Sequence, residues 1–221
     1  MRILQVITSL DMGGAETLVV NLIPRLQALG YTVDLCVFDC TETPLTKRLK
    51  SECLQTKIYA LGHGVYNPLY ILKLAKIMKN YDIVHTHNSS PQLFVAIASL
   101  FSRTKIVSTE HNTSNRKRNW KWYRPIESWM YGRCISKIAE DKLREYMGGE
   151  WLVESSNRYK SITTINNGID VDAISEAVPC KELLGLKENR KSILMVAGFR
   201  KQKNQDTIIR ALTLLDKEKY E

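Results

Sequence analysis

The sequence lacks the features that mark membrane-spanning, disulfide-rich and fibrous proteins. Its best apolar run, Leu93–Leu100, is far shorter than the ~18 to 20 residues that a membrane-spanning helix requires. No CxxC pair, short-period repeat or low-complexity segment occurs. Hydrophobic residues make up 44% and charged residues 25%, which is the balance of an ordinary globular chain. These values exclude collagen-like, disulfide-scaffold and disordered proteins.

Residues 1–8 form a short apolar run with one charge and no small-residue cleavage site. We therefore predict a first strand here and not a signal peptide. The five cysteines are an odd, scattered set, which predicts reduced and mostly buried thiols. They are Cys36, Cys40, Cys53, Cys134 and Cys180. Together these observations predict a cytoplasmic protein.

Acidic side chains are outnumbered by basic ones. The 221 residues include 32 Lys and Arg against 23 Asp and Glu, which gives a formal net charge of +9. A surplus of this size predicts an anionic partner, namely a phosphate-bearing substrate, a nucleic acid or an acidic membrane face.

Short β-rich runs alternate with helical runs over residues 1–172. This alternation predicts an α/β domain, a Rossmann-like doubly wound parallel sheet with helices on its faces. Strands are expected at residues 3–8, 32–38, 57–60, 82–86, 105–109 and 161–165. Helices are expected near residues 18–29, 45–49, 68–77, 90–101, 125–131 and 138–147. Gly30 is expected to stop the first of these helices.

A different pattern follows an expected linker at residues 173–190. Residues 191–221 contain one apolar run, Ser192–Gly198, which predicts a strand, and one amphipathic helix that carries Ile208 and Leu212. One strand and one helix cannot form a sheet alone, because a buried parallel strand needs neighbours on both edges. We expect the start of a truncated second domain, whose apolar strand is covered by the first domain or by self-association through residues 191–221.

The loop after the first expected strand carries Gly13 and Gly14 and opens a helix. In a doubly wound fold such loops line the ligand crevice, and glycines at a helix start let an anion approach free N–H groups. The alternative is an ordinary tight turn. The spacing is not GxGxxG, so a dinucleotide site is not expected.

Three of the four histidines lie at the ends of two expected strands. His85 and His87 lie two residues apart and so share one face of a strand, and His111 lies between Glu110 and Asn112 after the next strand. The three side chains fit a metal site, acid–base groups, or hydrogen bonds to a sugar or phosphate. The alternative is a set of structural histidines.

Two basic stretches are present. Residues 116–124 interleave Arg and Lys with Trp and Tyr, which suits an anionic membrane surface, single-stranded nucleic acid, or a plain solvated loop. Residues 198–204 open the last expected helix with three cations, which predicts a phosphate site. An Asn-Gly turn at residues 167–168 follows the expected strand 161–165.

Taken together, these motifs resemble those of glycosyltransferase family 4, the retaining GT-B enzymes. The matching segments are GGAE at 13–16, DIVHTH at 82–87, TEHN at 109–112, INNGID at 165–170 and QKN at 202–204. The resemblance implies two Rossmann-like domains that face each other across a cleft. It identifies this chain with the acceptor domain, the N-terminal half of a GT-B fold, plus the first strand and helix of the donor domain.

The resemblance also implies residue roles. His111 matches the family's active-site histidine, which contacts the donor sugar, and is the catalytic candidate. Lys203 matches the lysine that neutralises the leaving diphosphate, and Arg200 is the candidate replacement for the family's arginine, which falls at Gly198. The donor-binding candidates are Gly13, Gly14, Gly168, Arg200 and Lys203. The acceptor-binding candidates are Glu16, His87, Asn112, Arg116 and Trp120.

By this resemblance we expect a hexosyltransferase-type glycosyltransferase in cell-surface polysaccharide synthesis. It would move a sugar from a nucleotide-sugar donor to a saccharide or lipid-linked saccharide with retained configuration, using no metal, no other cofactor and no nucleic acid. An anionic membrane surface is an expected partner at the inner face of the cell membrane. The 221-residue chain alone is expected to have negligible turnover. The alternatives are a non-catalytic module for anionic saccharides, a metal-dependent hydrolase, and a GT-B sugar-nucleotide epimerase.

Overall fold

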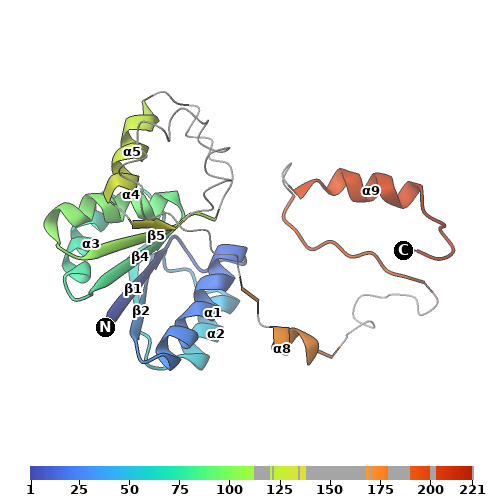
Figure 1. Cartoon of the computed structure of the whole chain (residues 1–221), viewed down its shortest axis with the longest axis horizontal. Helices are drawn as coiled ribbons and strands as arrows, with labels where there is room; N and C mark the ends of the chain where they lie inside the picture. Colours follow the sequence, from blue (N-terminus) through green and yellow to red (C-terminus); the bar gives the residue numbers. More distant parts are fainter. Residues whose placement is uncertain are drawn as a thin grey trace. The chain divides into compact units, whose positions relative to one another are not determined.

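The computed structural model describes residues 1–111, 120, 122–133, 135–137, 168–169, 171–178, 190–199 and 203–220. The chain forms two units, Met1–Asn167 and Gly168–Glu221 (Figure 1). None of the helices in these described ranges combines the length and apolarity needed to cross a bilayer. The expected domain limits at 172 and 190 stay predictions.

Six parallel strands of the first unit form one sheet in the order β3-β2-β1-β4-β5-β6, counted over the described residues. They are β1 (Arg2–Ile7), β2 (Thr32–Asp39), β3 (Ile58–Gly62), β4 (Ile83–His87), β5 (Lys105–Thr109) and β6 (Ile135–Lys137). Five of them confirm expected strands, with ends that coincide with the expected ones or differ by one or two residues. The sequence does not predict β6, because three residues are too few to show an apolar period. The expected strand 161–165 and helix 138–147 lie outside the described residues.

Helices cover both faces of the sheet (Figure 1). On one face lie α1 (Gly14–Ala28) and α2 (Pro44–Glu52), and on the other lie α3 (Leu69–Met78) and α4 (Ser89–Ala98). A 3-10 turn (Ser99–Phe101) follows α4, and α5 (Tyr123–Arg133) packs beside α4. This arrangement confirms the expected doubly wound α/β fold.

Alternate residues of β1 enter two separate cores. Leu4 and Val6 pack with side chains of α3 and α4, whereas Ile3 and Ile7 pack with side chains of α1 and α2. Each such buried side chain stabilises the fold by about 1.5–3 kcal/mol. Gln5 is the exception in this strand, since its polar side chain is 0% exposed.

Local signals at the helix ends behave as the sequence predicts. Gly30 has a φ of 85°, and its N–H donates to the Gln27 carbonyl at 2.9 Å while the Tyr31 N–H donates to the Leu26 carbonyl at 3.2 Å. These bonds form the glycine-ended cap that terminates α1.

The cysteines that the structure describes are free thiols. Cys36 and Cys53 are buried, as predicted, and burial raises the pKa of Cys36 to about 12. Cys40 is half-buried, and Cys134 and Cys180 lie outside the described residues.

The described part of the second unit contains two helices, α8 (Val171–Ser175) and α9 (Gln205–Thr213). The strand expected at Ser192–Gly198 is wrong: those residues are extended without a strand, and one bridge joins Lys191 to Tyr220. A parallel strand gains its stability from neighbouring strands, and none of the described residues supplies one here. Leu194 and Val196 are consequently 69% and 88% exposed, and α9 buries none of its residues.

Candidate active site

The strand order of the sheet reverses between β1 and β4. Strands β2 and β3 continue from one side of β1, while β4, β5 and β6 continue from the other. Doubly wound sheets bind ligands outside the carboxyl ends of their strands at such a point. Here these ends are Ile7 of β1, His87 of β4 and Thr109 of β5.

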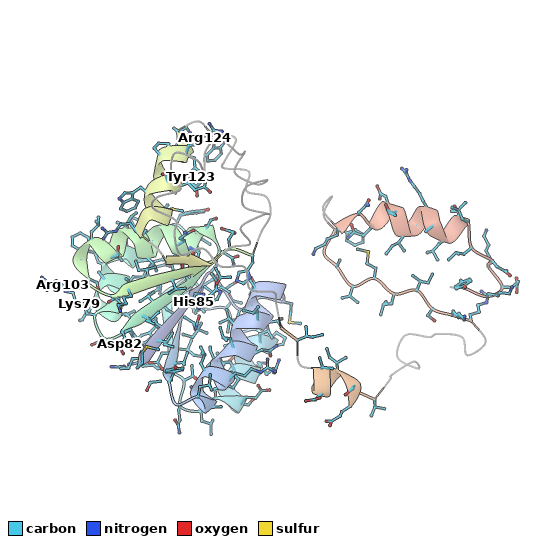
Figure 2. All side chains as sticks on the ribbon, in the orientation of Figure 1. Lys79, Asp82, His85, Arg103, Tyr123 and Arg124 are labelled. Atoms are coloured by element: carbon cyan, nitrogen blue, oxygen red, sulfur yellow. The ribbon has the colours of Figure 1, made fainter. Side chains whose placement is uncertain are left out.

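Polar side chains gather near these ends on one face of the sheet. Gln5 is paired in register with His85, and His87 is paired with Thr109. Residues opposite each other in a parallel pair present their side chains to the same face. Figure 2 labels His85 on the sheet, and its Nε2 lies 2.7 Å from the hydroxyl oxygen of Thr109.

Gln5, His87 and His111 form a continuous hydrogen-bonded chain. The Oε1 atom of Gln5 lies 2.8 Å from Nε2 of His87, and Nδ1 of His87 lies 3.0 Å from Nε2 of His111. The rings of His87 and His111 are stacked at 20° with centroids 5.2 Å apart, and the His85 ring lies 4.2 Å from that of His87.

Both linked histidines are held neutral. Burial lowers the pKa of His87 well below its usual value, and the neighbouring rings of His85 and His111 lower it further. Burial also lowers the pKa of His111. Withdrawal from water penalises the charged imidazolium, so two adjacent rings do not both carry a proton charge.

The loop between β1 and α1 opens the helix at the same edge of the sheet. Gly13 precedes α1 in an extended conformation with no side-chain cap, and a Cβ on Gly14 would meet no atom within 4 Å. The Glu16 carboxylate lies back over Gly13. The Thr43 hydroxyl donates to the Leu10 carbonyl at 2.6 Å and ties this loop to α2. The free N–H groups of this helix start suit an anion.

The other loop at the reversal point holds a strained residue. Asn88 follows His87 directly and has a φ of 71°, a left-handed value that is uncommon outside glycine. Backbone strain of this kind costs about 1–3 kcal/mol and clusters at functional sites. Asn88 therefore belongs among the candidate site positions.

The structure brings some of the predicted site residues together and leaves others apart. Gly13, Gly14, Glu16, His87 and His111 lie in loops or strand ends at the carboxyl edge of the sheet. His87 is 0% exposed and is hydrogen-bonded to His111, so the acceptor contact expected of His87 stays a prediction.

The remaining predicted residues are spread over the chain. Trp120 stacks on Trp122 ahead of α5, and Gly168 and Lys203 belong to the second unit. Asn112, Arg116 and Arg200 lie outside the described residues.

The histidines do not form a metal site in the described part of the chain, where no group of three or more His, Cys, Asp and Glu side chains has suitable geometry. Both ring nitrogens of His87 are engaged by Gln5 and His111. A metal would have to replace one of these hydrogen bonds, so the donor set fits poorly.

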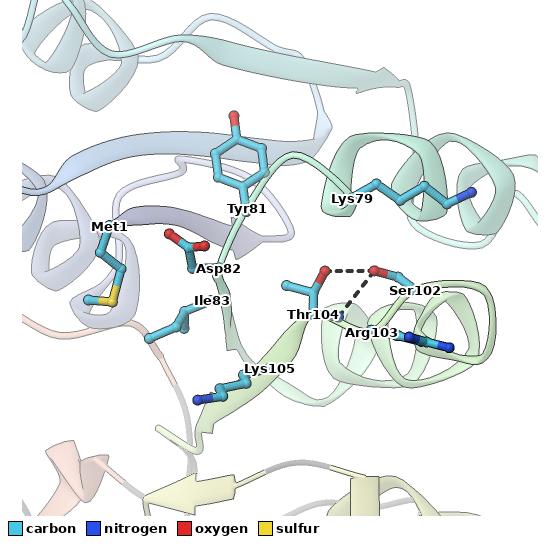
Figure 3. A pocket seen from close by; sticks show the side chains of 9 residues that line it. All are labelled: Met1, Lys79, Tyr81, Asp82, Ile83, Ser102, Arg103, Thr104 and Lys105. Carbon is cyan, nitrogen blue, oxygen red and sulfur yellow. Dashed lines mark hydrogen bonds between the residues drawn. The ribbon is translucent and has the colours of Figure 1, made fainter.

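A cavity of about 540 Å³ lies at the opposite end of the sheet, where β4 and β5 begin. Figure 2 shows Lys79, Asp82 and Arg103 together there, away from His85. In Figure 3 the Lys79 and Lys105 side chains extend to opposite sides, so their charges do not converge on one point. Ligand sites of this fold lie at the other edge.

Sequence reasoning missed two positions. Gln5 lies between Leu4 and Val6, and a single polar residue inside a buried parallel strand is the signal that identifies it. Asn88 follows the DIVHTH motif, but its positive φ has no equally clear signature.

Comparison with known proteins gives an independent result. The sequence model of Glycosyltransferase Family 4 matches residues 12–173. EpsF of Bacillus subtilis (strain 168), named as a glycosyltransferase, is 26% identical over 227 residues, which cover 95% of this chain and 57% of EpsF.

A second curated relative is the UDP-Gal:alpha-D-GlcNAc-diphosphoundecaprenol alpha-1,3-galactosyltransferase of Escherichia coli. It is 28% identical over 148 residues, which cover 61% of this chain and 37% of that protein. The chain thus spans little more than half the length of EpsF and less of the galactosyltransferase.

Among solved structures, HepE of Anabaena in complex with UDP and glucose superposes with a TM-score of 0.77 at 15% identity. The match covers 99% of this chain and 59% of HepE. At this identity the likeness concerns the fold, and it confirms the expected α/β architecture, the N-terminal half of a GT-B fold.

Proposed function

The chain belongs to glycosyltransferase family 4, and from this premise we propose that its protein transfers a sugar from a nucleotide-sugar donor to a saccharide or lipid-linked saccharide, with retained anomeric configuration. The observation that carries the proposal is the neutral, hydrogen-bonded pair of His87 and His111 at the point where the strand order reverses. The names of the curated relatives support this activity, because one acts on a diphosphoundecaprenol-linked sugar.

The proposed reaction breaks one bond, forms one bond and transfers one proton. The bond between C1 of the sugar and the donor diphosphate breaks, and C1 bonds to an acceptor hydroxyl oxygen. The acceptor proton leaves with the released nucleoside diphosphate. His111 would contact the donor sugar, and a neutral imidazole suits this place because it adds no charge that opposes the positive charge developing at C1.

The donor-binding candidates would supply the counter-charge for the leaving group. Gly13 and Gly14 would let the diphosphate or the sugar approach the first N–H groups of α1. Lys203, with Arg200 in place of the family's arginine, would stabilise the departing diphosphate. Gly168 would belong to the turn beside the interdomain hinge. HepE, which was solved with UDP and glucose, supports a UDP-sugar as donor. No metal or other cofactor is part of this proposal.

If the acceptor is linked to a membrane lipid, residues 116–124 would bind the membrane surface, and Glu16 and Asn112 would bind the acceptor. Trp120 and Trp122 stack with ring centroids 5.3 Å apart and are 49% and 61% exposed. Exposed aromatic rings among cations suit the headgroup level of an anionic bilayer. We propose that Trp120 and Arg116 dock the protein at the inner face of the cell membrane.

The docking proposal predicts that replacing both Trp120 and Trp122 with Ala weakens binding to phosphatidylglycerol vesicles at least tenfold. Sedimentation with the vesicles measures this. Trp129→Ala is the matched control, because Trp129 is 39% exposed on α5 outside the basic stretch. Equal binding by the double variant and the wild type would show that the membrane contact lies elsewhere.

The transferase proposal is tested on the complete protein with UDP-glucose or UDP-galactose and a lipid-diphosphate-linked sugar acceptor. We expect His111→Ala to lower kcat at least 100-fold, which corresponds to about 2.7 kcal/mol of transition-state stabilisation. The control is His63→Ala, because the His63 side chain is 81% exposed beyond the end of β3. Full transfer by His111→Ala would overturn the catalytic role of His111, and absence of transfer by the wild type would overturn the proposed function.

A further inference from the structure

We propose that Gln5 and His87 are positioning residues that hold the proton of His111 on Nε2, so that His111 offers the lone pair of Nδ1 to a hydroxyl group of the transferred sugar. The inference rests on the proposed function and deepens it by naming what the histidine recognises. A lone pair accepts a hydrogen bond from a sugar O–H, whereas a phosphate oxygen has no proton to donate.

Gln5 determines which ring nitrogen of His87 carries the proton. Its side chain is 0% exposed in the middle of β1, and its amide oxygen lies 2.8 Å from Nε2 of His87. With the amide turned so that its oxygen faces His87, Gln5 can only accept, which places the proton of His87 on Nε2. The Nε2 atom of Gln5 has no partner among the described residues, so this single bond is what compensates for burying the amide.

The tautomer of His87 in turn determines which ring nitrogen of His111 carries the proton. His87 is 0% exposed, and burial lowers its pKa well below the usual value, so the ring carries one proton. With that proton on Nε2, the Nδ1 atom of His87 is an acceptor. The Nε2–H of His111, 3.0 Å away, is then the donor.

The protonation of His111 itself leaves one ring nitrogen as an acceptor. Its ring is half-buried, stacks on His87 and is neutral because burial lowers its pKa. The single proton of this ring is used in the bond to His87. Its Nδ1 atom is therefore an unprotonated acceptor, and within the part of the chain that the structure describes no group bonds to it.

Nuclear magnetic resonance of the complete protein with 15N-labelled histidine tests the relay without activity. Long-range correlations from the ring carbon protons show which nitrogen carries the proton. We expect Nε2–H in both His87 and His111. In Gln5→Leu, which removes the accepting oxygen, His111 should show a mixture of the two tautomers, and kcat/KM should fall about tenfold. Gln92→Leu is the matched control, because Gln92 is also buried but makes no bond to a histidine, and it should leave the tautomer unchanged.

Calorimetry separates the sugar from the phosphate as the ligand group. We expect Gln5→Leu to weaken the Kd for UDP-glucose about tenfold and the Kd for UDP less than twofold. Equal weakening of both ligands would overturn the choice of the sugar hydroxyl. An Nδ1–H tautomer in the wild type would overturn the relay, even if Gln5→Leu does not fold.

The two proposals fail separately. Absence of transfer by the wild-type complete protein removes the proposed function, while the tautomer of His111 in the wild type still decides the relay. The reversed tautomer together with loss of transfer in His111→Ala leaves the transferase standing and removes the role of Gln5.

Discussion

Apolar side chains meet opposite surroundings in the two units of the chain. Leu4 of β1 is 0% exposed between strands β2 and β4, whereas Leu194 of the extended segment 192–198 is 69% exposed. Both belong to short apolar runs of similar composition. The difference lies in the neighbours: β1 pairs on both edges, and Leu194 has no paired strand among the described residues.

The histidine site depends on the same difference. Burial by the sheet and its helices is what lowers the pKa of His87 and permits a directed chain of hydrogen bonds from Gln5. Phosphate-binding candidates such as Lys203 are exposed in the second unit and make no comparable network there among the described residues. The proposed catalytic histidines therefore depend on a packed core, whereas an exposed lysine such as Lys203 does not.

The largest effect is expected from the same substitution made in both units. Leu4→Ala removes a fully buried side chain from the core under α3 and α4 and should lower the free energy of unfolding by about 2–5 kcal/mol. Leu194→Ala should change it by less than about 0.5 kcal/mol, since most of that side chain already meets water. Urea unfolding followed by far-ultraviolet circular dichroism measures both. Similar losses for the two variants would show that Leu194 is buried in solution, as self-association through 191–221 requires.

The fold of the first unit could largely be predicted from the sequence. Strands buried on both faces are nearly continuous apolar runs, and β1 and β2 are of this kind apart from Gln5 and Asp34. The error at Ser192–Gly198 has the same origin, because an apolar run records the tendency to pair and not the presence of a partner. The three-residue strand β6 forms by pairing with β5, and no local sequence pattern predicts this pairing.

The site was predictable only in part. His87 and His111 carry recognisable motifs, but the sequence could not place their nitrogens 3.0 Å apart. That distance depends on the register between β4 and β5. Gln5 lies 82 residues from its partner His87, so its role depends on the pairing of β1 with β4. Local sequence patterns hold no information on such long-range register.

The buried ring of His87 should make the stability of the folded chain depend on pH. The pKa of His87 is lowered in the folded chain, so below the usual imidazole value of 6.5 the unfolded chain binds more protons than the folded one. Stability should therefore fall as the pH drops below about 6.5, by up to about 1.4 kcal/mol per pH unit for this histidine. Urea unfolding between pH 7.5 and 5 measures the slope.

The control for the pH prediction is His87→Gln, which keeps a polar side chain but removes the titrating ring. Its absolute stability is expected to be lower, but its decline with falling pH should be shallower than that of the wild type. Parallel curves for the two proteins would show that other groups cause the acid sensitivity.

The smallest effect concerns how each unit begins a helix. In the first unit the Thr43 hydroxyl accepts from the Thr46 N–H at 3.2 Å and donates to the Leu10 carbonyl at 2.6 Å. In the second unit Asn204 precedes α9 and its side chain caps no N–H group of that helix. Thr43→Ala should therefore cost about 1 kcal/mol in urea unfolding, and Thr43→Ser, which keeps the hydroxyl, less than about 0.5 kcal/mol. Because the Leu10 contact steadies the loop that carries Gly13, Thr43→Ala should also weaken UDP-glucose binding, and Thr43→Ser should not. Equal binding by Thr43→Ala and the wild type would separate the loop from the helix cap and leave Thr43 a purely structural residue.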